Sequence, residues 1–279
     1  MKRKKPDNYG KEAMNKLYNS LPITSVAKTI TDIVGISPPK EAESSIDIVG
    51  NSAKMFFKDE KIDRVFIYNP DAVALWLFQK YTALFEKAIL QSNIQLPMLS
   101  VMPSVTPVCF ASMYTGATPD VHGIQAYEKP VLKTDTVFDA FIQADMKPAI
   151  VSTANDSISC IFLDRAMDYY IYDTHEECTK KAMELIAEDK HDLIVLYNGN
   201  YDAAMHRAGT ESTEAIKELT DNIETYVTLI KQIEKHWSNH RTMIGFCPDH
   251  GCHEIDGNLG SHGLDMAEDM NVIHFYRFI

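Results

Sequence analysis

The run Leu193-Ile194-Val195-Leu196-Tyr197 indicates how this chain folds. Its side chains are apolar or aromatic at successive positions, so the run predicts a strand that is buried on both faces. Residues 176–188 before it favour a helix, and a polar loop follows it. A doubly buried strand beside a helix is typical of a parallel sheet that is covered by helices.

The same alternation of short apolar runs and helical segments continues along the chain in both directions. Further strands are expected at 65–68, around Leu99 and Val101, and at 149–151, 169–171, 243–246 and 272–276. Helices are expected at 72–91, 136–144 and 213–237, and residues 158–163 form another short apolar run. The sequence therefore predicts an α/β protein with a mainly parallel sheet flanked by helices on both faces.

Residues 1–60 carry a different pattern from the rest of the chain. Their apolar residues recur at mixed helical spacing, which favours one or two helices and no core strand. The segment 37–41, which contains two prolines, interrupts this pattern. We expect an N-terminal helical extension, 1–60, that packs on a main domain, 61–279.

The composition indicates a globular protein and disfavours several other classes. Of the 279 residues, 45% are hydrophobic and 24% are charged, which argues against disorder. The formal net charge is −12 and Lys and Arg cluster only at the N-terminus, so no nucleic-acid-binding surface is expected.

The basic run 1–5 looks like the start of a signal peptide, but the apolar region that should follow it is missing. No apolar run approaches the ~20 residues of a membrane span. Pro6 and Asp7 stand where a signal peptide would need apolar residues. The five cysteines are odd in number and scattered, which fits reduced thiols. We therefore expect a cytoplasmic protein without a membrane anchor.

Residues able to bind a metal ion or attack an ester follow the expected strands. Ligands of parallel sheets bind beyond the carboxyl ends of the strands, so side chains in these loops are expected to converge. Any single one of them has an ordinary explanation, such as a helix cap or a surface pair. The set contains one hydroxyl, three carboxylates and three imidazoles: Thr106, Asp71, Asp202, Asp249, His206, His250 and His262.

These residue types suit one kind of chemistry. Carboxylate and imidazole ligands bind zinc and tolerate other divalent metals such as manganese. Two such ions about 3.5–4 Å apart are able to clamp an in-line displacement at phosphorus. A threonine hydroxyl is a poor nucleophile at neutral pH, so Thr106 would need a base or a metal ion to activate it.

Four motifs resemble those of the nucleotide pyrophosphatase/phosphodiesterase (type I phosphodiesterase) family of the alkaline phosphatase superfamily. In segment 103–124, Thr106 precedes a Thr-Gly pair, a Pro and a His-Gly-Ile, as the nucleophile does in that family. Segment 202–209 resembles its DxxxHxxG metal motif, 248–251 its DHG motif, and 261–263 the motif of its last histidine. The motifs occur in the family's order, and the resemblance covers about 62–279.

The resemblance implies an alkaline phosphatase-like fold and two divalent metal ions, with zinc preferred and manganese as the alternative. It implies that Thr106 is the nucleophile and also a ligand of the first ion. The other ligands implied are Asp71, Asp249 and His250 for the first ion, and Asp202, His206 and His262 for the second.

The chain departs from the family pattern in three places. The family usually has Asp-Gly after the first strand, where this chain has Asp71-Ala72. It often carries a phosphate-binding Asn after His-Gly-Ile, where this chain has Tyr127, a phenol able to donate one hydrogen bond to the substrate. The short spacing from Thr106 to Asp202 leaves room for only a small lid, within about 125–185.

The function that the resemblance implies is metal-dependent hydrolysis of phosphodiesters or pyrophosphates through a covalent phosphothreonine, with a small phosphate ester or nucleotide-like compound as substrate. The same metal core would serve a phosphomonoesterase, a phosphonate hydrolase or a phosphotransferase such as a mutase. A catalytically silent metal-binding protein is the alternative from another class. A sulfatase is disfavoured, because the Cys or Ser and the Arg of its nucleophile motif are missing from the matching positions.

Overall fold

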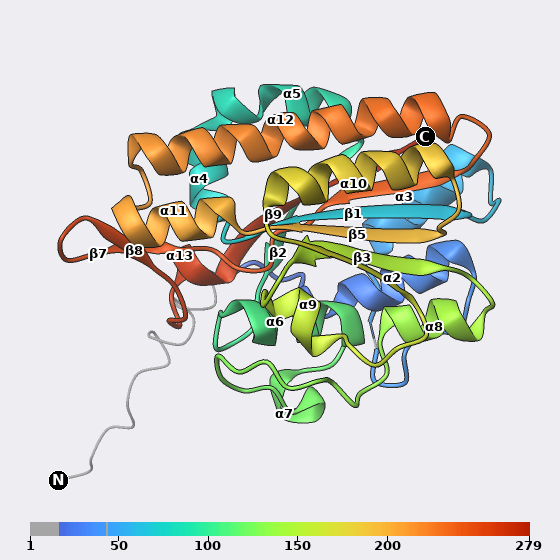
Figure 1. Ribbon diagram of the computed structural model, residues 1–279, viewed down its shortest axis with the longest axis horizontal. Coiled ribbons are helices and arrows are strands. Elements are labelled where there is room, and N and C mark those ends of the chain that lie inside the picture. Colours follow the sequence, from blue (N-terminus) through green and yellow to red (C-terminus); the bar gives the residue numbers. More distant parts are fainter. Residues whose placement is uncertain (1–16, 43) are drawn as a thin grey trace, which may run out of the picture.

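Seven strands form the main sheet of the computed structural model, which describes residues 17–42 and 44–279 (Figure 1). The spatial order of the strands is β2-β9-β6-β1-β5-β3-β4. Strand β9 runs antiparallel to its neighbours β2 and β6, and the other ladders of this sheet are parallel. The predicted α/β fold with a mainly parallel sheet is confirmed. The strands are β1 (Arg64–Pro70), β2 (Ile94–Leu99), β3 (Pro148–Thr153), β4 (Asp168–Tyr172), β5 (Leu193–Asn198), β6 (Thr242–Phe246) and β9 (Asn271–Phe278).

Helices cover both faces of the sheet, and a separate cluster of buried apolar side chains fills each interface (Figure 1). This is the arrangement expected when the strands are apolar on both faces. One face carries α2 (Ser25–Val34), α3 (Asp47–Phe57), α6 (Thr106–Thr115), α8 (Val137–Gln143) and α9 (Ser157–Ile161). The other carries α4 (Leu75–Lys80), the 3₁₀ helix η1 (Thr82–Phe85), α5 (Glu86–Gln91), α10 (His175–Glu188), α11 (Asn200–Ala208) and α12 (Thr213–His236).

The central strands are buried along their length. Every residue of β5 and β6 is buried, and β1 is buried from Val65 onward. Side chains of a strand alternate between the two faces, so Ile67 of β1 packs in the α6 layer whereas Tyr68 packs in the α12 layer. This burial on both faces explains why residues 193–197 are apolar at successive positions.

The prediction of one continuous helix at 72–91 is wrong. The segment is divided into α4, η1 and α5, and helical structure begins only at Leu75. Ala72 has a φ of 62°, outside the right-handed helical region, and Ala74 forms a β-bridge with Val272. The residues after Asp71 therefore continue the edge of the sheet before the chain turns into α4.

The described part of the N-terminal extension belongs to the same core as the sheet. Helices α2 and α3 bury Val26 and Val49 in the cluster that also contains Ile67, and Ile23 N donates to Leu99 O of β2 at 2.8 Å. Residues 1–16 of the predicted extension lie outside the described residues. The domain boundary at residue 60 and the lid within 125–185 stay predictions; in the latter range, β3 and β4 belong to the main sheet.

None of the described helices combines the length and the apolar character needed to cross a membrane.

Candidate active site

The carboxyl ends of the parallel strands bring the predicted site residues to one edge of the sheet, as the loop positions suggested. The hairpin of β7 (His253–Ile255) and β8 (Leu259–Ser261) contributes the last of them. Each residue follows a strand: Asp71 follows β1, Thr106 begins α6 after β2, Asp202 and His206 lie on α11 after β5, Asp249 and His250 follow β6, and His262 follows β8.

Asp71, Asp249 and His250 form a first ligand group, which is buried. His250 Nε2 lies 3.3 Å from Asp71 Oδ1 and 3.5 Å from Asp249 Oδ2. The Thr106 hydroxyl joins this group, 3.3 Å from Asp71 Oδ2 and 3.3 Å from His250 Nε2. The structure therefore brings the predicted nucleophile together with the three residues predicted to share its metal ion.

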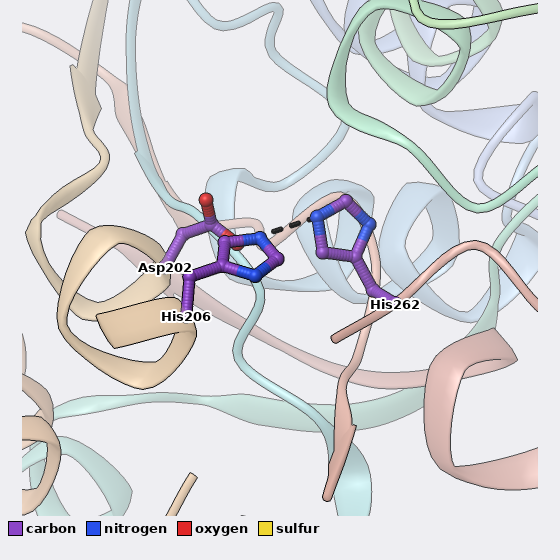
Figure 2. Close-up of side chains that lie close together, drawn as sticks. All are labelled: Asp202, His206 and His262. Carbon is purple, nitrogen blue, oxygen red and sulfur yellow. Dashed lines mark ion pairs between the residues drawn. The ribbon is translucent and has the colours of Figure 1, made fainter. Parts of the chain in front are cut away.

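Asp202, His206 and His262 form a second ligand group (Figure 2). His206 Nε2 lies 3.3 Å from Asp202 Oδ1, and His262 Nε2 lies 3.5 Å from the same oxygen. Asp202 and His206 project from one side of α11 because they are four residues apart. His262 reaches them from the loop after β8, so residues from two distant segments meet here.

A glycine lets the hairpin approach α11 closely enough to deliver His262. A Cβ atom added to Gly260 would lie 2.3 Å from Met205 Sδ and 2.8 Å from Met205 O. Any side chain at this position would therefore collide with α11 and push β8 away from it. The backbone contact also provides a partner for His206, whose Nδ1 lies 3.0 Å from Gly260 O.

All three histidines have the Nδ1 nitrogen engaged and the Nε2 nitrogen facing a carboxylate. Nδ1 lies 2.9 Å from Gly251 O in His250, and 2.9 Å from Ser104 O in His262. A carbonyl oxygen accepts, so Nδ1 carries the proton and Nε2 keeps its lone pair in the neutral ring. Burial and the neighbouring His250 lower the pKa of His262 to about 3, which keeps that ring neutral. Backbone contacts of this kind are typical of histidines that bind metal through the other nitrogen.

The two ligand groups are neighbours. The rings of His250 and His262 are stacked, with centroids 4.0 Å apart and planes inclined by 22°, and the His206 and His262 centroids are 5.0 Å apart. One histidine of each group therefore contacts the other group. The side chains of the two groups therefore line one continuous site.

Several carboxylate oxygens of the site lack compensating donors. Four of them are buried without a hydrogen-bond partner in the described part of the chain: Asp71 Oδ1, Asp202 Oδ1, Asp249 Oδ1 and Asp249 Oδ2. Burial, and the charge of Asp71 beside it, raise the pKa of Asp249 well above the usual carboxyl range. Buried carboxylates are costly unless a cation or donors compensate them. The donor set of carboxylates and imidazoles fits a divalent cation at each group.

A buried network behind the site ties three of its segments together. Asn69, two residues before Asp71, accepts a hydrogen bond from Tyr114 Oη at 2.5 Å and donates to Cys247 O at 2.6 Å. Tyr114 belongs to α6, which begins at Thr106, and Cys247 lies two residues before Asp249. Ala72, beside Asp71, has the positive φ that glycine adopts most readily, so the backbone here has the shape that an Asp-Gly pair allows.

The structure leaves one predicted residue outside these groups and adds another to them. Tyr127 lies in the loop after α7 (Pro119–His122) and is 63% exposed. Among the described hydrogen bonds none joins it to Thr106, so its role in substrate binding stays a prediction. The residue that the sequence analysis missed is Tyr197, whose hydroxyl donates to Asp71 Oδ2 at 2.5 Å. The sequence signal that could have pointed to Tyr197 was its position, because it is the aromatic residue near the carboxyl end of a strand buried on both faces.

His274 of β9 supports the segment that carries Asp249, and its burial predicts how the stability of the protein depends on pH. Its ring is fully buried, with Nε2 2.9 Å from Pro248 O. Burial lowers its pKa from 6.5 to about 4. In the unfolded chain this histidine binds a proton near pH 6.5, whereas in the folded chain it stays neutral until about pH 4. Its contribution to stability is therefore lost as the pH falls through this window, by on the order of 3 kcal/mol.

We expect His274→Gln to flatten the acid side of the stability profile. Urea unfolding at pH 8, 6 and 5 would measure the free energy of unfolding of both proteins. The wild type should lose more stability than the variant between pH 8 and pH 5. Equal losses in the two proteins would contradict the assignment to His274.

Comparison with known proteins gave a family match and several structural neighbours. The sequence profile of the family described as "Type I phosphodiesterase / nucleotide pyrophosphatase" matches residues 76–275. No curated protein sequence matches the chain significantly. Human ectonucleotide pyrophosphatase / phosphodiesterase 5 has a similar structure, with a TM-score of 0.60 and 14% identity; the match covers 77% of this chain and 87% of that one.

Two further neighbours were solved with small molecules bound. An inactive variant of the murine ectonucleotide pyrophosphatase / phosphodiesterase 5, in complex with AMP, matches with a TM-score of 0.57 and 17% identity, over 70% of this chain and 59% of that one. Phosphonoacetate hydrolase from Sinorhizobium meliloti 1021, in complex with phosphonoformate, matches with a TM-score of 0.52 and 17% identity, over 71% of this chain and 60% of that one. At these identities the neighbours show a shared alkaline phosphatase-like fold.

Proposed function

The chain belongs to the type I phosphodiesterase / nucleotide pyrophosphatase family, and on this basis we propose that it is a metal-dependent hydrolase of phosphate diesters or pyrophosphates. One observation carries the proposal: the Thr106 hydroxyl lies 3.3 Å from both Asp71 and His250, in a group where Asp71 Oδ1 and both Asp249 oxygens are buried without a donor in the described part of the chain. A hydroxyl among uncompensated metal-binding side chains is the arrangement that an activated nucleophile requires.

Two cations bound at the two ligand groups would lower the pKa of the Thr106 hydroxyl and stabilise negative charge on the phosphate oxygens. The first group, with Thr106, would hold one ion, and the second group would hold the other. Zinc suits this mixture of carboxylate and imidazole ligands, and manganese is the alternative.

Thr106 performs the covalent step of the proposed reaction. Its oxygen attacks phosphorus, and the bond from phosphorus to the leaving oxygen breaks with its electron pair. The hydroxyl proton passes to solvent, and the leaving oxygen takes up a proton from solvent in exchange. Water then hydrolyses the adduct on Thr106 and restores the hydroxyl. A monoester gives phosphothreonine, whereas a diester gives an adduct that keeps the remaining ester group.

The start of α6 contributes to binding of the phosphate. Thr106 is the first residue of this helix. Pro107 has no N–H group, and Val108 N and Cys109 N both donate to Val105 O at 3.0 Å. The N–H group of Thr106, which has no partner among the described hydrogen bonds, and the positive end of the helix dipole therefore remain to favour an anion. The nucleophile and an anion-binding helix end therefore come from the same residue position.

Hydrolysis of bis-p-nitrophenyl phosphate and p-nitrophenyl phosphate tests the proposal. After removal of metal by a chelator we expect no turnover of either ester, and recovery when zinc or manganese is added back. The diester should react faster than the monoester. Equal activity with and without chelator would contradict metal dependence, and faster hydrolysis of the monoester would point to a phosphomonoesterase.

A further inference from the structure

We propose that Tyr197 is a positioning residue that orients the Asp71 carboxylate for the metal ion on the Thr106 side of the site. The inference rests on the proposed function, because it assigns a role toward the metal ion that the first ligand group would hold. Its starting point is the hydrogen bond from Tyr197 Oη to Asp71 Oδ2, at 2.5 Å.

The sheet register brings these two side chains together. Strands β1 and β5 are parallel neighbours, and Asn69 of β1 pairs with Tyr197 of β5. Asp71 N continues this ladder by donating to Asn198 O at 2.9 Å. Residues 69 and 71 project to the same face because they are two apart on an extended chain. Tyr197, paired with Asn69, lies on that face as well, next to the α6 layer that carries Thr106.

The phenol ring is held on several sides. It is 5% exposed, and its centroid lies 5.7 Å from that of Phe110 and 5.8 Å from that of His175, both in T-shaped contacts. Gly199 makes room for the hydroxyl, since a Cβ atom there would lie 2.7 Å from Tyr197 Oη and would displace it. A fixed ring with a fixed hydroxyl is a suitable device for orienting a neighbouring carboxylate.

The hydrogen bond gives the two Asp71 oxygens different roles. Oδ2 receives the Tyr197 hydroxyl, whereas Oδ1 is buried without a donor and faces His250 Nε2 at 3.3 Å. Carboxylates that bind metal ions are commonly hydrogen-bonded by a neighbouring residue, which fixes the orientation of the free oxygen. Without the Tyr197 hydroxyl, Oδ2 would keep only the longer contact with the Thr106 hydroxyl, at 3.3 Å. Asp71 would then rotate more freely and would spend part of its time in orientations unsuited to the ion.

Titration of the metal-free protein with zinc, followed by calorimetry, tests this role. The wild type should bind two ions. Tyr197→Phe, which keeps the ring and removes the hydroxyl, should still bind two, one of them about 10–100-fold more weakly. In an Asp202→Asn background, which disables the second group, the remaining ion should show the whole of this loss.

Two further variants separate positioning from a general effect on folding. Gly199→Ala keeps the Tyr197 hydroxyl but forces it to move, so it should weaken the binding of the same ion. This variant tests the proposal if Tyr197→Phe fails to fold. Tyr226→Phe removes the hydroxyl of a fully buried tyrosine in the α12 layer and should leave both zinc affinities unchanged.

The outcomes distinguish this inference from the function on which it rests. A wild-type chain that binds no zinc or manganese would overturn both. A wild type that binds two ions, together with a folded Tyr197→Phe that binds both as tightly, would overturn the role of Tyr197 and leave the proposed function intact. A selective loss of affinity for one zinc ion in Tyr197→Phe and Gly199→Ala, with unchanged affinities in Tyr226→Phe, would support the proposal.

Discussion

Thr106→Ala is expected to lower kcat for ester hydrolysis on the order of 10³-fold or more, because it removes the attacking oxygen. The hydroxyl lies 3.3 Å from both Asp71 and His250, and alanine places no oxygen at this position. Steady-state kinetics with bis-p-nitrophenyl phosphate at saturating zinc would measure the loss. The variant should keep most of its thermal stability, since the change removes two small groups at the edge of the sheet.

Thr106→Ser is the matched control, because it keeps a hydroxyl at the same position and loses only a methyl group. We expect it to retain far more activity than Thr106→Ala. Mass spectrometry of acid-quenched wild type should in addition detect a phosphoryl-containing adduct on the peptide that contains Thr106. Full activity in Thr106→Ala, with zinc bound as in the wild type, would show that another group attacks phosphorus.

Asp249→Asn should change stability in opposite directions with and without metal. Asp249 is fully buried, and neither of its oxygens has a hydrogen-bond partner in the described part of the chain. Removing this uncompensated charge should stabilise the metal-free protein by about 2 kcal/mol. In excess zinc the wild type gains about 4 kcal/mol for each ion present at 1,000 times its Kd, and the variant should lose most of that gain at the first ligand group.

Urea unfolding in chelator and in excess zinc would show this reversal of the stability order. Asp269→Asn is the matched control, because Asp269 is equally buried but has partners for both oxygens, His253 Nδ1 at 2.7 Å and Leu264 N at 2.8 Å. It should destabilise the protein under both conditions. If Asp249→Asn were less stable than the wild type in chelator, the carboxylate would have a partner that compensates it without metal.

The local pattern of the sequence predicted much of the fold and of the site. Successive apolar residues at 193–197 predict a strand buried on both faces, and the structure shows that burial. Residues placed just after such strands must meet at one sheet edge, because parallel strands share their direction. For that reason Thr106, Asp71 and His250, predicted from separate segments, lie within hydrogen-bonding or ion-pairing distance of one another.

Other features depend on contacts between segments far apart in the chain, and only the tertiary structure decided them. The helix expected from Ala72 begins at Leu75 because the preceding residues bridge to β9, which the local pattern does not reveal. Which nitrogen of His250 or His262 faces the carboxylates follows from the backbone carbonyl that each ring meets. The contact of Tyr197 with Asp71 follows from the register of β1 and β5. Composition and periodicity determined which residues are buried and which kinds of ligand are present, because those properties are local. The pairing of strands determined which atoms meet, because the pairing is set by the packing of the whole sheet.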